Sequence, residues 1–275
     1  MAANFMFPPV GFGPGSQPGP EEGEDLAYLA MPSGMRVFEP HFPMVDDPLK
    51  ASAACRMLTA LARDAGDWTQ AGGVIHRDIA GLDASARAVL ADAMGEGEVA
   101  IAIRGGRQVD IQESVFAGVW RVAENGREHI EIGAIPAAVL NSPAVPVPAA
   151  PIPGFGVVNA PAILTEILDH AAQHRAGGPA HAINLTLLPH TPEDLDHIDQ
   201  VLGRGGVTIL SRGYGNCRIE QTARPDIWRV RYYNSQDALI LDSIEVTLVP
   251  EVALAAPEDI ADSAERLAEV AEALV

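Results

Sequence analysis

Apolar positions in the first half of the chain follow a helical and then a strand-like spacing. After Pro48, apolar residues recur every three or four positions and stop at Gly66, a spacing typical of a helix that buries one face. A short strand-like run at 74–79 precedes a second helix, which begins after Asp83 and stops at Gly95. Four runs that predict strands follow. They cover 98–103, 110–116, 119–123 and 129–135.

The second half repeats this order of elements. Asn159 is placed to cap a helical run, and a strand-like run at 181–187 leads to a second helix at 192–202. Four further runs predict strands, so this half also ends in an antiparallel meander. They cover 207–211, 217–222, 227–233 and 239–248.

The two halves share residue types at one constant offset without gaps. In the first half these are Gly95, Gly97, Val99, Ile101, Arg104, Gly105, Ile111, Trp120, Arg121 and Val122, and in the second half Gly203, Gly205, Val207, Ile209, Arg212, Gly213, Ile219, Trp228, Arg229 and Val230. Identities occupy about a third of the aligned window, whereas chance predicts roughly one position in fifteen. We interpret the halves as a duplication. The predicted fold is α+β, with two tandem repeats of α-β-α followed by an antiparallel meander.

These patterns divide the chain into six segments. They are a Pro/Gly-rich tail that we expect to be disordered (1–24), an extended lead-in (25–47), the first α+β repeat (48–136), a Pro/Ala-rich linker (137–158), the second α+β repeat (159–250) and an acidic, amphipathic C-terminal helix (251–275).

Composition and charge narrow the class of partner. The 275 residues include 18 Lys and Arg against 37 Asp and Glu, for a formal net charge of -19. This charge repels phosphate backbones and anionic lipids, so we expect no nucleic-acid partner. Prolines interrupt the uncharged stretch 132–165, so we expect no direct membrane insertion there. Only two cysteines, Cys55 and Cys217, are present, and no secretory signal is visible, which favours the cytoplasm.

The segment with the most unusual composition lies between two predicted strands of the second repeat. It consists of Arg212, Gly213, Tyr214, Gly215, Asn216, Cys217 and Arg218. Its glycines fit a hairpin turn in which Gly213 and Gly215 take positive φ, and pattern alone favours this interpretation. The first repeat keeps a turn glycine there but has no counterpart of Tyr214, Asn216 or Cys217. These extra side chains indicate a loop specialised for contact, and 212–218 is the candidate partner-binding site.

Cys217 and two histidines are the candidates for redox or metal chemistry. Arg212 or Arg218 would favour the thiolate of Cys217, although a half-buried structural cysteine on a strand is the simpler interpretation. His170 and His174 stand four residues apart on one predicted helix, a spacing that places both rings on one face where they could bind zinc or nickel. No Glu or Cys completes such a site, so we predict no resident metal and no cofactor.

The sequence contains no nucleotide-binding loop, dinucleotide fingerprint, nucleophile elbow or zinc-protease motif. We therefore predict that the protein is not an enzyme. Trp120 and Trp228 occupy equivalent positions on predicted strands and are expected to anchor the core.

Several segments resemble the HupH/HyaF family of NiFe-hydrogenase expression/formation proteins. The resemblance is carried by 213–219 (GYGNCRI), 227–235 (IWRVRYYNS), 244–250 (IEVTLVP), 185–202 and 28–35. It covers most of the chain outside the two tails and is most specific in GYGNCRI.

The resemblance implies a cytoplasmic, non-catalytic accessory or chaperone protein. Such a protein would bind the iron–sulfur small subunit precursor of the hydrogenase before export, together with other hydrogenase accessory proteins. The residues leave an alternative open, a redox or metal and iron–sulfur handling protein that uses Cys217. A third interpretation is an enzyme whose site spans the two repeats.

Overall fold

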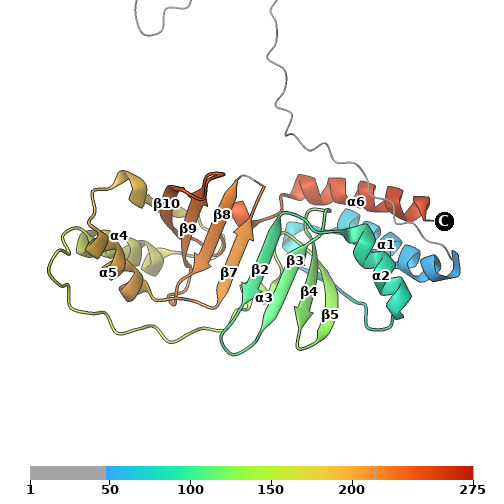
Figure 1. Ribbon diagram of the computed structural model, residues 1–275, viewed down its shortest axis with the longest axis horizontal. Coiled ribbons are helices and arrows are strands. Elements are labelled where there is room, and N and C mark those ends of the chain that lie inside the picture. The colour runs from blue at the N-terminus through green and yellow to red at the C-terminus, as the bar shows by residue number, and fades with distance from the viewer. Residues whose placement is uncertain (1–47, 214, 275) are drawn as a thin grey trace, which may run out of the picture. The chain divides into compact units, whose positions relative to one another are not determined.

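The computed structural model describes residues 48–213 and 215–274, which contain both helices and strands (Figure 1). In the first half, α1 (Pro48–Asp67), β1 (Ile75–Asp78) and α2 (Ala84–Met94) precede β2 (Val99–Ile103), β3 (Val109–Glu113), β4 (Val119–Glu124) and β5 (Arg127–Ile132). The Asp83 carboxylate accepts from the Ala86 backbone N–H at 2.8 Å and caps α2 as predicted. The predicted tail and lead-in, 1–47, lie outside the described residues.

The second half repeats this order of elements. It consists of α4 (Ala160–Gln173), β6 (His181–Asn184), α5 (Pro192–Leu202), β7 (Val207–Ser211), β8 (Asn216–Gln221), β9 (Ile227–Tyr233) and β10 (Leu239–Val246). Helix α6 (Pro257–Ala273) follows and packs against α1. The predicted strand at 181–187 is too long, because a 3-10 turn (Leu185–Leu187) replaces its end.

Two local predictions are wrong. The predicted linker is not extended throughout, because it begins with the short helix α3 (Ala137–Leu140), whose first N–H donates to the Glu131 carboxylate at 2.8 Å. Asn159 precedes α4 but does not cap it with its side chain, which donates to the Pro189 carbonyl at 2.9 Å. The Asp194 carboxylate of α5 takes over this function by accepting the backbone N–H groups at the start of α4.

Within the described residues, ten strands form one antiparallel sheet in the order β1-β5-β4-β3-β2-β7-β8-β9-β10-β6. The β2–β7 pair joins the halves, with Ile101 opposite Ile209. Each half contributes five strands in the same order from the edge to the centre. The fold is therefore α+β as predicted, and its origin by duplication stays a prediction.

Two glycines at equivalent positions of the two halves are required for the same steric reason. A Cβ atom at Gly97 would lie 2.1 Å from the Ser114 carbonyl oxygen, and one at Gly205 would lie 2.5 Å from the Thr222 carbonyl oxygen. Both glycines are required where a neighbouring backbone passes too close for a side chain.

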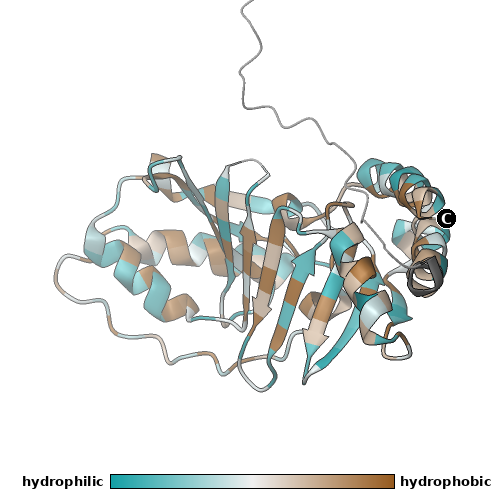
Figure 2. Ribbon diagram, turned by 45° about the vertical axis from the view of Figure 1, so that its right-hand side comes forward, coloured by the Kyte–Doolittle hydropathy of each residue, from teal (hydrophilic) through white to brown (hydrophobic). Residues whose placement is uncertain are grey.

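Side chains alternate between the two faces of the sheet and form three apolar clusters. One face carries Trp120 and Trp228, both buried in a cluster that β2 and β7 share. On the other face, α1, α2 and α6 cover the first half and α4 and α5 cover the second, at opposite ends of the sheet (Figures 1 and 2). The central strands lie between these two helical groups. No helix of the described part of the chain is long and apolar enough to cross a membrane.

One carboxyl group is buried where β3 ends. Glu113 accepts a hydrogen bond from the Gly118 N–H at 3.1 Å. Burial raises the pKa of Glu113 to about 7, and the negative charges of Glu98 and Asp259 act in the same direction. Because the folded-state pKa lies above the unfolded one, this group stabilises the fold best below the unfolded pKa, and the stabilisation is lost as pH rises towards 7.

We expect Glu113→Gln to be more stable than the native chain at pH 8, by about 3 kcal/mol, since the amide keeps an acceptor for Gly118 and carries no charge. Urea unfolding at pH 8 and pH 4.5 measures the difference, which should nearly vanish at the lower pH. The exposed Glu128→Gln is the control and should change neither value. Equal stabilities of Glu113→Gln and the native chain at pH 8 would contradict the pKa assignment.

Candidate functional site

The candidate segment 212–218 forms the connection between β7 and β8 and the start of β8. Ser211 lies opposite Cys217 at the last pair of the ladder, so the predicted hairpin is confirmed. Gly215 has the predicted positive φ, 94°, whereas Gly213 does not have one. A Cβ atom at 213 would meet the end of the exposed Glu98 side chain, which is free to shift, so the space there does not require a glycine. Tyr214 lies outside the described residues.

The hairpin borders an open hollow of about 370 Å³ on the sheet. Its lining comes from two hairpins and consists of Leu210, Ser211, Arg212, Asn216, Cys217, Arg218, Tyr233 and Asp237. Asn216 pairs with Tyr233, and Tyr233 in turn pairs with Leu239 on β10. Leu210, Leu239 and Ile240 are exposed large apolar side chains of these strands. We call the exposed residues Leu210, Arg212, Asn216, Arg218, Leu239 and Ile240 the hairpin patch.

Cys217 is not part of the exposed surface. It is 3% exposed and lies directly opposite Tyr232. Burial raises the pKa of Cys217 to about 11, so the sulfur is a neutral thiol at neutral pH. The expectation that Arg212 or Arg218 favours the thiolate is therefore wrong. Both arginines are exposed, and the Arg218 guanidinium donates to Glu220 at 2.9 Å.

The structure places His170 beside His181 and Glu166. The rings of His170 and His181 stack with centroids 3.4 Å apart, and the Glu166 carboxylate lies 3.0 Å from His181 Nε2. The expectation that no Glu completes a set of ligands around His170 is therefore wrong, because Glu166 lies one helical turn earlier. His174 is the C-terminal cap residue of α4 and is not part of this group.

Sequence reasoning missed a second group of metal-ligating side chains. His76 of β1 and His129 and Glu131 of β5 bring their ligand atoms within 4.8 Å of one another. The available signal was the alternation along β5, which places His129 and Glu131 on one face of the strand. The third residue, His76, is brought next to them only by the register of β1 against β5.

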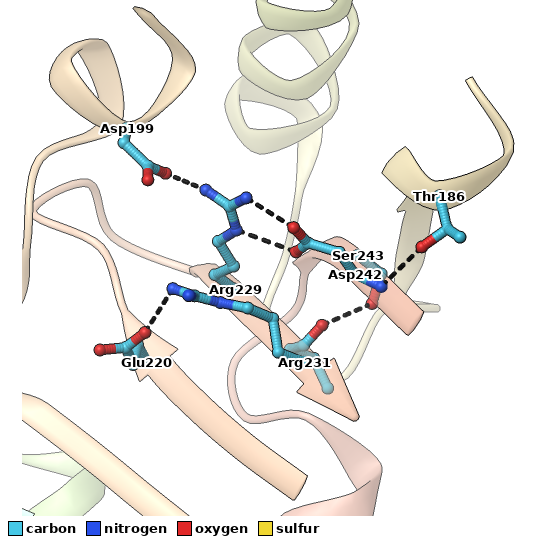
Figure 3. Close-up of polar contacts among 8 residues, drawn as sticks. Thr186, Asp199, Glu220, Arg229, Arg231, Asp242 and Ser243 are labelled. Carbon is cyan, nitrogen blue, oxygen red and sulfur yellow. Dashed lines mark hydrogen bonds and ion pairs between the residues drawn. The ribbon is translucent and has the colours of Figure 1, made fainter. Parts of the chain in front are cut away.

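Two arginines of β9, within the segment 227–235, form ion pairs, and the pair of Arg229 with Asp242 is buried. The Arg229 guanidinium donates to both oxygens of Asp242, at 2.9 and 2.6 Å, and to Asp199 of α5 (Figure 3). Arg231 donates to Glu220 at 2.6 Å. Because both arginines already have carboxylate partners within the chain, we assign this network to the stability of the second half rather than to ligand binding.

Fold and site together define an α+β protein with a hairpin patch of exposed apolar and polar side chains. The family described as "HupH hydrogenase expression protein, C-terminal conserved region" matches residues 53–144 and 157–274. The chain is 55% identical over 278 residues to "Hydrogenase expression/formation protein HupH" of Rhodobacter capsulatus, which covers 100% of both chains. It is 34% identical over 212 residues to "Hydrogenase-1 operon protein HyaF" of Escherichia coli strain K12, covering 73% of this chain and 74% of that one.

A solved structure of a hydrogenase expression protein HupH from Thiobacillus denitrificans is 35% identical, with a TM-score of 0.36, and covers 38% of this chain and 87% of that one. The chain belongs to the HupH/HyaF family of hydrogenase expression/formation proteins.

Proposed function

We propose that this protein is a non-catalytic accessory protein of NiFe-hydrogenase maturation that acts in the cytoplasm. It binds the iron–sulfur small subunit precursor before export, with other hydrogenase accessory proteins, and the hairpin patch makes the contact. The names of the relatives, which are hydrogenase expression/formation proteins, support the maturation role. Similarity over the full length of the Rhodobacter protein supports the transfer of that role to this chain.

The observation that carries the proposed contact is the composition of the hairpin patch. Exposed Leu210 lies directly opposite Arg218. Exposed Leu239 lies two strands from Asn216, with Tyr233 of β9 between them, and Ile240 follows Leu239. Exposed apolar side chains beside hydrogen-bonding groups are typical of a surface that another protein covers. The alternative thiol mechanism has less support, because Cys217 is buried and neutral, and thiolate is the form that reacts or binds metal.

The test measures binding of the purified full-length chain to the small subunit precursor with its export signal attached, under anoxic conditions. We expect the double variant Asn216→Ala, Leu239→Ser to bind at least tenfold more weakly, because it removes one hydrogen-bonding and one apolar contact, and tenfold corresponds to about 1.4 kcal/mol. The matched control is Ile152→Ser, which removes an apolar side chain that is 92% exposed outside the patch and should leave affinity unchanged.

Cys217→Ser separates the two mechanisms. A contact made by the hairpin patch keeps native affinity in this variant, provided that circular dichroism shows an intact fold. Loss of binding in folded Cys217→Ser would favour the thiol mechanism, and native affinity in the double variant would exclude the hairpin patch as the contact.

A further inference from the structure

Two neighbouring strands at one edge of the sheet bring three metal-ligating side chains together. β1 pairs with β5, and this register places His76 directly opposite Glu131. His129 precedes Glu131 by two positions on β5, so its side chain emerges on the same face. Three side chains of the types that bind zinc and related ions thus converge on one face.

The distances within this group suit a common ion. His129 Nε2 lies 3.2 Å from Glu131 Oε1, and the rings of His76 and His129 are 4.2 Å apart between centroids. Two donors held tetrahedrally at the usual zinc distances lie roughly 3.3 Å apart. The second oxygen of Glu131 accepts the Ala137 N–H at 2.8 Å, and Glu131 is buried. The carboxylate is therefore held in place by the start of α3, just as hydrogen bonds from neighbouring groups orient the ligands in metal proteins.

The second half of the chain shows that the sheet edge does not require these histidines. Glu245 lies opposite Trp228 as Glu131 lies opposite Trp120. Across from Glu245 on the edge strand, however, the second half has Ala182 where the first half has His76. Two positions before Glu245 it has Ser243 where the first half has His129. The glutamate is common to both edges, and the pair of histidines is specific to the first.

We infer that His76, His129 and Glu131 form a binding site for a divalent transition-metal ion, with Zn²⁺ as its representative. Two imidazole nitrogens and one carboxylate oxygen are a ligand set for Zn²⁺ and its neighbours in the first transition row, and not for Mg²⁺ or Ca²⁺, which take oxygen ligands. His76 is exposed, so an ion reaches the site from solvent. Three protein ligands leave a fourth position for water or for a donor from a partner.

The group of Glu166, His170 and His181 suits a single ion less well. Its two rings are nearly parallel, at 10°, and stacked at 3.4 Å. Because the nitrogen lone pairs lie in the ring planes, two parallel stacked rings do not direct them to one point. The planes of His76 and His129 are tilted by 37°, so their lone pairs can converge.

The experiment titrates Zn²⁺ into the full-length chain, freed of metal and of any affinity tag, by isothermal calorimetry. We expect one Zn²⁺ per chain, with affinity at least tenfold weaker in His76→Ala and in His129→Ala, since each removes one of three ligands. His170→Ala is the matched control, because it removes a histidine from the other group, and it should bind as the native chain does. Co²⁺ gives a second readout, since its visible bands report nitrogen and oxygen ligation, and a strong near-ultraviolet thiolate band should be absent.

The exposed position of His76 keeps the test informative if His129→Ala fails to fold. Absence of Zn²⁺ binding at millimolar concentration would overturn the inference. Native affinity in folded His76→Ala, or loss of binding in His170→Ala alone, would also overturn it. A thiolate band with Co²⁺ would assign the ion to a cysteine instead.

Discussion

Replacement of Asp242 by leucine is expected to lower the free energy of unfolding by about 3–5 kcal/mol, because it leaves a buried guanidinium without its principal partner. The side chains of Arg229 and Asp242 are each 8% exposed and form two parallel hydrogen bonds. Burial alone would lower the pKa of Arg229, but Asp242 and Asp199 outweigh it and hold that pKa above its ordinary value. A guanidinium stays protonated in proteins even without a partner, so the charge persists in the variant. Asp199 is half exposed and compensates for the unpaired charge of Arg229 only in part.

The matched control removes both charges together. In the double variant Arg229→Met, Asp242→Leu no buried charge remains, and apolar side chains fill the same space. We expect it to recover most of the stability that Asp242→Leu loses, as measured by guanidinium unfolding at pH 7 with the slope compared among the three proteins. If the double variant were as unstable as Asp242→Leu, packing or the backbone of β10, rather than the unpaired charge, would explain the loss.

Local sequence patterns predicted most of the elements but not the contacts between them. The run 227–233 alternates and was predicted as a strand, and β9 has these same bounds. The partners of Arg229 could not be predicted, because Asp199 and Asp242 are 30 and 13 residues away and reach it through packing of α5 and the register of β10. The pairing of β2 with β7, which joins the two halves, likewise follows from tertiary structure alone.

In the candidate site, too, the local turn was predicted and the contacts between distant residues were not. The glycines predicted the hairpin, because tight turns favour them. The error at Cys217 came from treating Arg212 and Arg218 as neighbours in space. In a strand, adjacent side chains point to opposite faces, so exposed Arg218 lies on the face that Cys217 does not occupy. The group around His129 was missed because His76 is brought to it by strand pairing, which spacing along the chain does not reveal.

Replacement of Asp194 by alanine is expected to lower the free energy of unfolding by about 4 kcal/mol, since one carboxylate accepts several backbone N–H groups. Oδ1 accepts from Val158, Asn159 and Ala160 at 2.7, 2.9 and 2.9 Å, and Oδ2 accepts from Thr191 at 3.0 Å. Asp194 thus closes the capping box of α5 and also supplies the acceptor that the first turn of α4 lacks. Without it, the hydrogen bonds between α5 and the start of α4 are lost, and only apolar packing joins the two helices.

The pH dependence of this loss of stability shows whether the charge of the Asp194 carboxylate causes it. Burial would raise the pKa of Asp194, but its four N–H donors outweigh burial and hold the pKa well below the ordinary range. A folded-state pKa below the unfolded one contributes stability that is complete above about pH 4 and is lost as pH falls further. We therefore expect the deficit of Asp194→Ala, measured by urea unfolding, to be largest at pH 7 and smaller at pH 3.

The control for Asp194 is Asp196→Asn, an exposed aspartate of the same helix, which should leave stability unchanged at both pH values. Asp194→Asn keeps one acceptor oxygen without the charge, so we expect a loss between those of the native chain and Asp194→Ala. A loss below about 1 kcal/mol in Asp194→Ala would mean that water satisfies the released N–H groups. In that case the contacts between α4, α5 and the sheet, rather than this carboxylate, would hold the helices of the second half together.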